Sequence, residues 1–163
     1  MAHSLLQAEV LTPAGREHWA TGRFGYGYRS SLLKRGEARA VVLSAEMKLS
    51  NATPESVAAR IAAFSERRKL AQPPGASMGS MFKNPEGDAA GRLIEAAGLK
   101  GTRIGNAEVS PIHGNFFINR GDARASDIRA LIAVVQERVR ERMGVELELE
   151  VELVGEWTDQ GRG

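Results

Sequence analysis

The chain has 163 residues, of which 42% are hydrophobic and 26% charged, a composition typical of a water-soluble globular protein. Its 22 basic and 20 acidic residues leave a net charge of +2, which argues against nucleic acid as a partner of the whole surface. The sequence has no cysteine and no apolar run of about 18 residues, which excludes disulfides, thiolate chemistry and a membrane span, so we expect a cytoplasmic protein.

The first 50 residues predict two strands separated by a loop. The first strand covers residues 5–11 and ends at the turn Thr-Pro-Ala-Gly, residues 12–15. A loop rich in glycine and tyrosine follows, with RFGYGY at 23–28. Residues 38–49 predict the second strand.

A helix and a loop follow in the middle of the chain. Thr53 is a preferred N-cap residue and Pro54 suits the first helical position, so we expect a helix from here to about Leu70. Its last turn carries the basic cluster Arg67-Arg68-Lys69. These charges either stabilise the negative end of the helix dipole or meet an anionic ligand. Residues 72–80 predict a loop.

Two more helices and two short strands are predicted beyond residue 80. Asp88 caps a short helix over 89–97, and the strands cover 107–110 and 115–119. Ser126 caps the longest helix, which ends at Gly144. One face of that helix is apolar, with Ile128, Leu131, Ile132, Val135, Val139 and Met143 at helical spacing.

The last predicted element is a strand over residues 145–154, VELELEVELV. Strict alternation places valine and leucine on one face and Glu146, Glu148, Glu150 and Glu152 on the other. We expect a disordered tail over 158–163. Strands separated by helices indicate an α+β fold.

The stretch GSMFKNPEGD, residues 79–88, combines groups that could bind or protonate an anionic ligand. Gly79 permits a tight bend that leaves the hydroxyl of Ser80 exposed, and Lys83 and Asn84 offer donors. The alternative is an ordinary polar turn. No histidine is close in sequence and the P-loop pattern is absent, so Ser80 fits a proton donor or ligand contact better than a nucleophile.

Three other positions could take part in chemistry. Arg29 follows FGYGY and could present its guanidinium to a carboxylate or phosphate, or simply lie on the surface. One of the four strand glutamates could point into a cleft while the others face water. His113 is a structural or a ligand-binding histidine, and the three histidines are too far apart in sequence to predict a metal cluster.

Three stretches together resemble the C-terminal part of the UDP-N-acetylenolpyruvoylglucosamine reductase (MurB) family. Residues 79–119 resemble its substrate-domain segment, residues 126–156 resemble its closing helix and strand, and YGYRSS at 26–31 resembles its arginine motif. The short spacing between Lys48 and Gly79 resembles the subtype with the shorter substrate domain. Leu149 occupies the place where the family usually has a proline.

The resemblance implies a flavoenzyme that uses FAD and NADPH to reduce UDP-N-acetylglucosamine enolpyruvate to UDP-N-acetylmuramate in peptidoglycan synthesis. Ser80 would protonate C2 of the enolpyruvyl group, and Arg29 and Glu150 would stabilise the enolate-like intermediate. The remaining implied contacts are Asn84, Lys83, His113 and Arg68 for the substrate, and Tyr28 and Arg29 for the cofactor.

The resemblance also implies that this chain is a fragment, because the family's N-terminal flavin-binding half has no counterpart here. We expect residues 1–50 to be the end of the flavin-binding domain and residues 51–157 to be a small mixed α/β substrate-binding domain. The chain alone should hold FAD weakly and be inactive, and its N-terminal strand should present an open edge. Its partner is then the N-terminal half or a second copy. The alternatives are a nucleotide-sugar-binding module without flavin and an inactive remnant.

Overall fold

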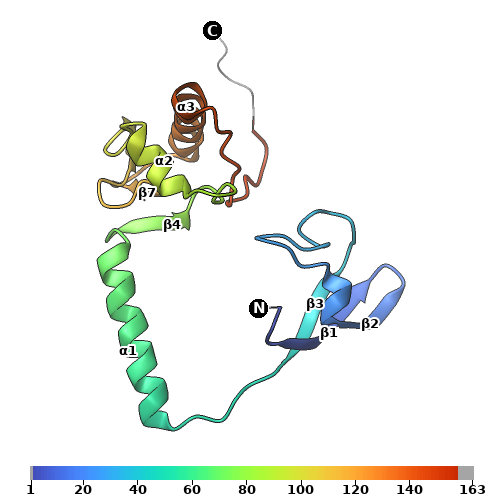
Figure 1. Ribbon diagram of the computed structural model, residues 1–163. Helices are drawn as coiled ribbons and strands as arrows, with labels where there is room; N and C mark the ends of the chain where they lie inside the picture. Colours follow the sequence, from blue (N-terminus) through green and yellow to red (C-terminus); the bar gives the residue numbers. More distant parts are fainter. Residues whose placement is uncertain (1, 158–163) are drawn as a thin grey trace. The chain divides into compact units, whose positions relative to one another are not determined.

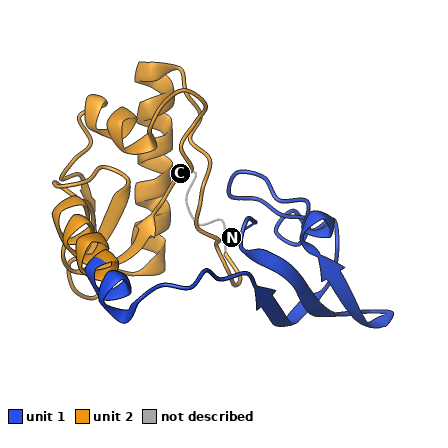
Figure 2. Cartoon of the chain, turned by 60° about the horizontal axis from the view of Figure 1, so that its bottom comes forward, with its two compact units in different colours: residues 1–59 blue, residues 60–163 orange. Residues whose placement is uncertain are grey.

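The computed structural model describes residues 2–157 and divides the chain into two compact units, residues 1–59 and 60–163 (Figure 2). Each unit has its own antiparallel sheet and its own hydrophobic core. Three α-helices accompany the two sheets in the described residues, which confirms the predicted α+β class. The expected tail at 158–163 lies outside the described residues.

The first unit is a three-stranded sheet in the order β2-β1-β3, followed in the chain by the start of a helix (Figure 1). Its elements are β1 (Leu5–Thr12), β2 (Gly15–Ala20), the 3-10 helix η1 (Thr21–Phe24) and β3 (Val41–Met47). The buried side chains of this unit are Leu5, Ala8, Val10, Trp19 and Phe24. The two predicted strands are confirmed.

Strand β2 lies between the predicted turn at 12–15 and the predicted loop at 23–28, where the sequence predicted no element. Thr12 and Gly15 pair directly, so the two residues between them form a hairpin turn that sends the chain back along β1. The segment is mostly polar, and only Trp19 is buried, which explains why no apolar pattern marked it as a strand. The turn, rather than strand propensity, creates β2.

The open edge predicted for the N-terminal strand is wrong, because β1 pairs with β2 on one side and β3 on the other. The exposed strand is β3, all seven residues of which are open to solvent. The register with β1 shifts between Ser44 and Val42, so a bulge at Leu43 interrupts the alternation of the two faces. Val41, Val42, Leu43 and Met47 are nevertheless all exposed large apolar residues of this strand.

Helix α1 (Pro54–Ala71) begins and ends close to the predicted residues. The hydroxyl of Thr53 accepts the N–H of Ser56 at 3.3 Å, which confirms the predicted cap. No residue of the helix is buried. Its amphipathic signal is correspondingly weak, so local capping rather than packing defines this helix.

The second unit has a four-stranded sheet in the order β4-β7-β6-β5. Its elements are β4 (Ala76–Ser80), α2 (Ala90–Ala96), β5 (Arg103–Ile104), β6 (Ala107–Val109), β7 (Phe116–Asn119) and α3 (Ala125–Met143). The loop predicted over 72–80 is wrong for its second half, which pairs with β7 as β4. ASMGS has no β-branched residue, so its strand form depends on the partner strand.

Both predicted N-caps of this unit are wrong by one or two residues. Helix α3 is capped at Arg124, whose N–H is accepted by Asp127 at 3.0 Å, and not at Ser126. At α2 the N–H of Ala90 is accepted by the amide oxygen of Asn84 at 3.0 Å, while Asp88 accepts the N–H of Ala89 and pairs with Arg92. Both helices end before glycines in the left-handed conformation, as predicted.

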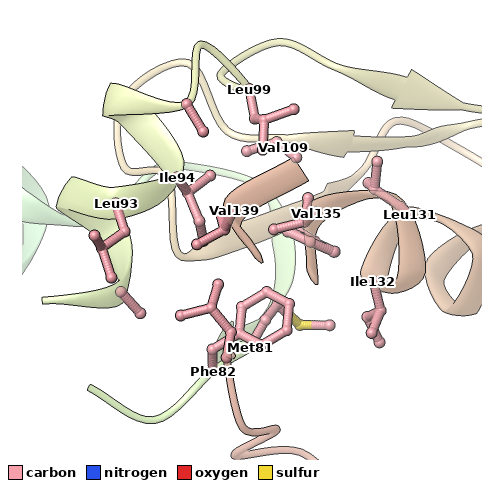
Figure 3. Packing of buried hydrophobic residues seen from close by; sticks show 14 of the residues in the cluster. Met81, Phe82, Leu93, Ile94, Leu99, Val109, Leu131, Ile132, Val135 and Val139 are labelled. Carbon is pink, nitrogen blue, oxygen red and sulfur yellow. The ribbon is translucent and has the colours of Figure 1, made fainter. Parts of the chain in front are cut away.

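The predicted apolar face of α3 is confirmed, because its central residues are buried in the main core (Figure 3). Leu131, Ile132, Val135 and Val139 are the fully packed members, and they face Met81, Phe82, Leu93 and Ile94 among others. Met81 and Phe82 are both completely buried. The segment directly after β4 is thus anchored in the core.

The strand predicted over 145–154 is wrong as an element but right in its two faces. Among the described residues, the single bridge of this segment joins Leu149 to Phe82. The apolar side nevertheless packs on the core through Val145, Leu147, Leu149 and Val151. Glu146, Glu148 and Glu152 are exposed.

Candidate functional site

Three segments of the second unit meet around Met81, and we call residues 80–84, 113–115 and 148–150 the Met81 junction. The N–H of Met81 is donated to the carbonyl of Asn115 at 2.9 Å. On the other side the carbonyl of Met81 accepts the N–H of Glu150 at 2.8 Å. Backbone hydrogen bonds therefore place the segment after Ser80 directly beside Glu150.

Ser80 ends β4 at a place where the strand is irregular. The register between β4 and β7 shifts between Ser77 and Ser80, and Gly79 lies in the shifted stretch with φ 84°. A Cβ on Gly79 would meet nothing within 4 Å, so the backbone conformation, and not space, calls for glycine. Ser80 remains half-buried and leads into the buried Met81.

Glu150 differs from the other three glutamates of its segment. It is half-buried, whereas Glu146, Glu148 and Glu152 are exposed, as predicted for the solvated members of the set. The hydrogen bond from its N–H to Met81 holds its backbone in place. Ser80 and Glu150 thus belong to adjoining segments of one junction.

The two donors predicted beside Ser80 both have structural partners. The Lys83 ammonium lies 2.8 Å from the Glu148 carboxylate, and this hydrogen bond, with the attraction between the charges, lowers the pKa of Glu148. The Asn84 oxygen accepts the N–H of Ala90, so any contact with an anion falls to its amide nitrogen. An ion pair therefore already engages the Lys83 ammonium, and helix capping engages the Asn84 oxygen.

His113 packs by its ring against Phe116, with centroids 4.9 Å apart, and is half-buried. Its Nδ1 accepts the N–H of Asn115 at 3.2 Å. The neutral ring therefore carries its proton on Nε2, which leaves that atom as a hydrogen-bond donor. A Cβ on Gly91 would lie 2.9 Å from the ring, so glycine lets helix α2 approach it closely.

Tyr28 and Arg29 lie at the tip of a tight turn in the first unit. Gly27 and Ser30 exchange backbone hydrogen bonds of 3.0 and 3.2 Å across it. Arg29 is exposed and has φ 53°, a left-handed conformation that is uncommon outside glycine, and its guanidinium lies 5.9 Å from the Tyr28 ring centroid. Its meeting with Ser80 and Glu150 stays a prediction, because it belongs to the other unit.

Arg68 lies in the last turn of α1, outside the segments of the Met81 junction. It is exposed, and its Nε lies 3.4 Å from the Gln72 side chain. The neighbouring Lys69 pairs with Glu66 at 2.7 Å. This geometry is that of basic residues at a helix C-terminus, and contact with a ligand stays a prediction.

The resemblance implied Tyr28 and Arg29 as cofactor contacts, and an aromatic ring and a guanidinium suit stacking and phosphate contact. They form an exposed turn rather than a cradle, since Tyr28 is 63% exposed. Within residues 2–157 no three His, Asp or Glu side chains gather as metal ligands. None of the helices described there has the length and apolar character needed to cross a bilayer.

A hollow of about 330 Å³ lies elsewhere in the second unit, between β4, β7 and the start of α3. Its lining includes Ser77, Met78, Phe117, Asn119 and Ile128 and no charged residue. Ser80 is not part of it. Nothing in that lining suits acid–base chemistry, so we place the candidate site at the Met81 junction.

The sequence analysis missed two buried polar residues of the second unit, Asn115 and Glu108. The amide of Asn115 hydrogen-bonds the backbone of Phe82, and Glu108 pairs with Arg103 and Arg120. A signal for both existed, because each is a polar residue inside an apolar stretch, AEV and GNFFI. Such residues are buried only when they are paired.

Known proteins match this chain along almost its whole length. A family model described as UDP-N-acetylenolpyruvoylglucosamine reductase, C-terminal domain, matches residues 69–154. The UDP-N-acetylenolpyruvoylglucosamine reductase of Chloroflexus aggregans is 50% identical over 157 residues, which cover 94% of this chain and 53% of that protein. The reductase of Deinococcus radiodurans is 44% identical over 160 residues, covering 98% and 51%.

A solved structure gives the same result. The crystal structure of UDP-N-acetylenolpyruvylglucosamine reductase from Thermus caldophilus matches with a TM-score of 0.78 at 40% identity, covering 93% of this chain and 53% of that one. The chain thus spans about half the length of the relatives that it matches.

Proposed function

Because this chain belongs to the UDP-N-acetylenolpyruvoylglucosamine reductase family, as its motifs predicted, we propose that it is the substrate-binding part of a flavoenzyme of peptidoglycan synthesis. The complete enzyme would be an NADPH- and FAD-dependent UDP-N-acetylmuramate dehydrogenase acting in the cytoplasm. Its substrate would be UDP-N-acetylglucosamine enolpyruvate. This chain alone, at half the length of its relatives, would bind substrate without turning it over.

Reduced FAD, when bound, would supply a hydride to C3 of the enolpyruvyl group. Charge then develops on the substrate carboxylate as C2 becomes carbanion-like. Arg29 would stabilise that charge through its guanidinium, and Glu150 would complete the catalytic set. Ser80 would deliver its hydroxyl proton to C2 and complete the reduction.

The anionic tail of the substrate would lie along the donors near Ser80. The Asn84 amide nitrogen, the Lys83 ammonium and His113 Nε2 are three donors of the Met81 junction. Lys83 would have to share its charge between Glu148 and a phosphate. Arg68 would contribute only if the substrate reaches the end of α1.

The observation that carries this proposal is the hydrogen bond between the Glu150 N–H and the Met81 carbonyl. This hydrogen bond joins the segment of Glu150 to Met81, the residue that follows the proposed proton donor Ser80. A domain that served only to bind a nucleotide sugar would not need a serine and a half-buried glutamate in adjoining segments.

Calorimetry of the chain with UDP-N-acetylglucosamine enolpyruvate tests the proposal. We expect binding by the wild type and a loss of roughly three- to tenfold in Ser80→Ala, the worth of about one hydrogen bond. Ser77→Ala is the matched control, because it changes the same residue type on the same strand. A folded wild-type chain that does not bind, or equal losses in both variants, would contradict the proposal.

One observation favours a second candidate, a nucleotide-sugar-binding module that works without flavin. Tyr28 and Arg29 lie on an exposed turn that does not enclose a cofactor. Flavin absorbance of the purified chain separates the two candidates when it is measured with the N-terminal half of a relative added. Flavin uptake on mixing supports the reductase, and uptake that never occurs supports the module.

We also propose that the exposed face of β3 is covered by residues corresponding to the N-terminal half of the relatives. Its exposed large apolar residues are Val41, Val42, Leu43 and Met47, and its outer edge has no partner strand in the described residues. Strands with this pattern are normally buried, and open edges pair readily with another segment. A second copy of the chain is the competing occupant.

A further inference from the structure

Asn115 is the most densely bonded residue of the Met81 junction. It is 3% exposed and comes directly before β7. Its side-chain oxygen accepts the N–H of Phe82 at 2.9 Å, and its side-chain nitrogen donates to the carbonyl of Phe82 at 2.8 Å. Its own carbonyl accepts the N–H of Met81 at 2.9 Å. One residue therefore makes three hydrogen bonds to two consecutive residues.

This pattern extends the pairing of β4 with β7 past its last backbone pair. Ser80 pairs with Phe116, and Met81 continues the register by bonding Asn115. At Phe82 the side-chain amide takes the place of a backbone unit, because it offers one donor and one acceptor like a peptide group. The backbone from Ser80 to Phe82 is thus fixed on one side by this residue.

The other side of the same backbone holds the glutamate segment. Met81 accepts the N–H of Glu150, and Phe82 forms the bridge to Leu149. The two residues that Asn115 bonds are therefore the two that connect Ser80 to Glu150. The N–H of Asn115 also bonds His113 Nδ1, which fixes the tautomer of that ring.

We propose that Asn115 is a positioning residue, which sets Ser80 and Glu150 in register for the substrate without touching it. The proposal rests on the proposed function, since it assigns Asn115 a role in that same site. Geometry must be held to a fraction of an ångström for productive proton delivery, and a buried bidentate amide supplies that constraint. Loss of the amide would leave the Phe82 backbone groups buried and unpaired.

The test uses the chain with UDP-N-acetylglucosamine enolpyruvate as the probe. The variants are Asn115→Ala and Asn115→Asp, the second of which keeps the side-chain volume and an acceptor for the Phe82 N–H in case the first does not fold. Asn119 is the matched control, because its side chain also accepts two backbone N–H groups, of Gly121 and Ala123, at the far end of β7. Each variant is also combined with Ser80→Ala.

If Asn115 acts through Ser80, Asn115→Asp weakens binding about as much as Ser80→Ala, and the double variant is no weaker than Ser80→Ala alone. Amide hydrogen exchange of Phe82 and Glu150 becomes faster, while that of Val135 in the core of α3 is unchanged. Asn119→Asp leaves the affinity within about twofold of the wild type, because surface changes away from such networks have small effects.

The outcomes separate this proposal from the proposed function. Wild-type affinity in both Asn115 variants, or losses that add to that of Ser80→Ala, overturns the positioning role and leaves the function standing. If Asn115 only stabilises the fold and does not act through Ser80, the losses of affinity in Asn115→Asp and Ser80→Ala add in the double variant. A folded wild-type chain that fails to bind the probe overturns the proposed function and the positioning role with it.

Discussion

Two residues of the proposed site hold left-handed backbone conformations for opposite reasons. Gly79, with φ 84°, meets the ordinary requirement for glycine at an irregular strand. Arg29, with φ 53°, is not a glycine, and such a conformation costs about 1 kcal/mol or more. A turn that retains arginine against this cost is consistent with a side chain selected for contact with a ligand.

Glu108 is a buried carboxylate that the sequence alone did not predict. Its carboxylate is buried and lies 2.6 Å from both the Arg120 Nε and the Arg103 Nη2. The hydrogen bond from Arg120, with the charges of both arginines, lowers the pKa of Glu108 from its ordinary 4.5 in spite of burial. A group with a lowered pKa stabilises the fold above its unfolded-state pKa and loses this contribution as the pH falls through its folded-state pKa.

We predict that Glu108→Gln destabilises the second unit at neutral pH by about 1.5–3 kcal/mol, the range for hydrogen bonds to charged groups. The half-exposed arginines can rehydrate, which limits the loss. The difference from wild type should shrink below pH 4.5, as the wild-type carboxylate takes up its proton. Urea unfolding at pH 7, 5 and 3 measures this. Glu95→Gln, in an exposed pair with Lys100, is the control and should change little at any pH.

At the scale of elements, α2 can approach the loop before β7 closely because residue 91 is a glycine. Gly91 lies inside the helix, where alanine would normally be preferred by about 1 kcal/mol. The His113 ring fills the space beside Gly91, and a Cβ on Gly91 would lie 2.9 Å from that ring. The conformational cost of glycine is offset by the approach of a ring that the proposed substrate site uses.

We predict that Gly91→Ala does not stabilise the wild-type chain, because the new methyl group displaces the His113 ring. In a His113→Ala background the same change should stabilise by about 1 kcal/mol, because only the helix preference remains. Thermal unfolding of the four chains in this cycle measures the coupling. Equal effects of Gly91→Ala in both backgrounds would show that the ring does not restrict this position.

At the scale of the whole molecule, the exposed apolar residues of β3 indicate a contact surface. Single exposed apolar residues are ordinary, but Val41, Val42, Leu43 and Met47 are four large ones on one strand of seven residues. The chain spans 53% of the Chloroflexus aggregans relative.

We predict that the N-terminal half of that relative binds the chain, and that Val41→Lys combined with Leu43→Lys weakens the complex at least tenfold, because both charges would be buried unpaired. Leu49→Lys is the control, since Leu49 is an even more exposed apolar residue that lies beyond the strand. Analytical ultracentrifugation measures the complex. A wild-type chain that dimerises instead, with the dimer lost in the double variant, would assign the face to a second copy.

Local signals in the sequence were sufficient for much of the fold. Thr53 and Pro54 fixed the start of α1, the glycines after α2 and α3 ended those helices, and apolar spacing located the buried face of α3. These features depend on neighbours within a few residues, so the chain specifies them before any tertiary contact forms. Local motifs such as GSMFKNP also carried the family resemblance that the comparisons confirmed.

Tertiary structure alone decided the features that depend on partners distant in the chain. Strand β4 exists because β7 pairs with it, and residues 145–154 form no strand because only Met81 to Lys83 is available to them. The same long-range contacts brought Glu150 beside the segment after Ser80 and buried Asn115 on the opposite side of that segment. Sequence by itself determines which groups a segment offers, and hydrogen-bond partners more than 30 residues away determine which of those groups meet.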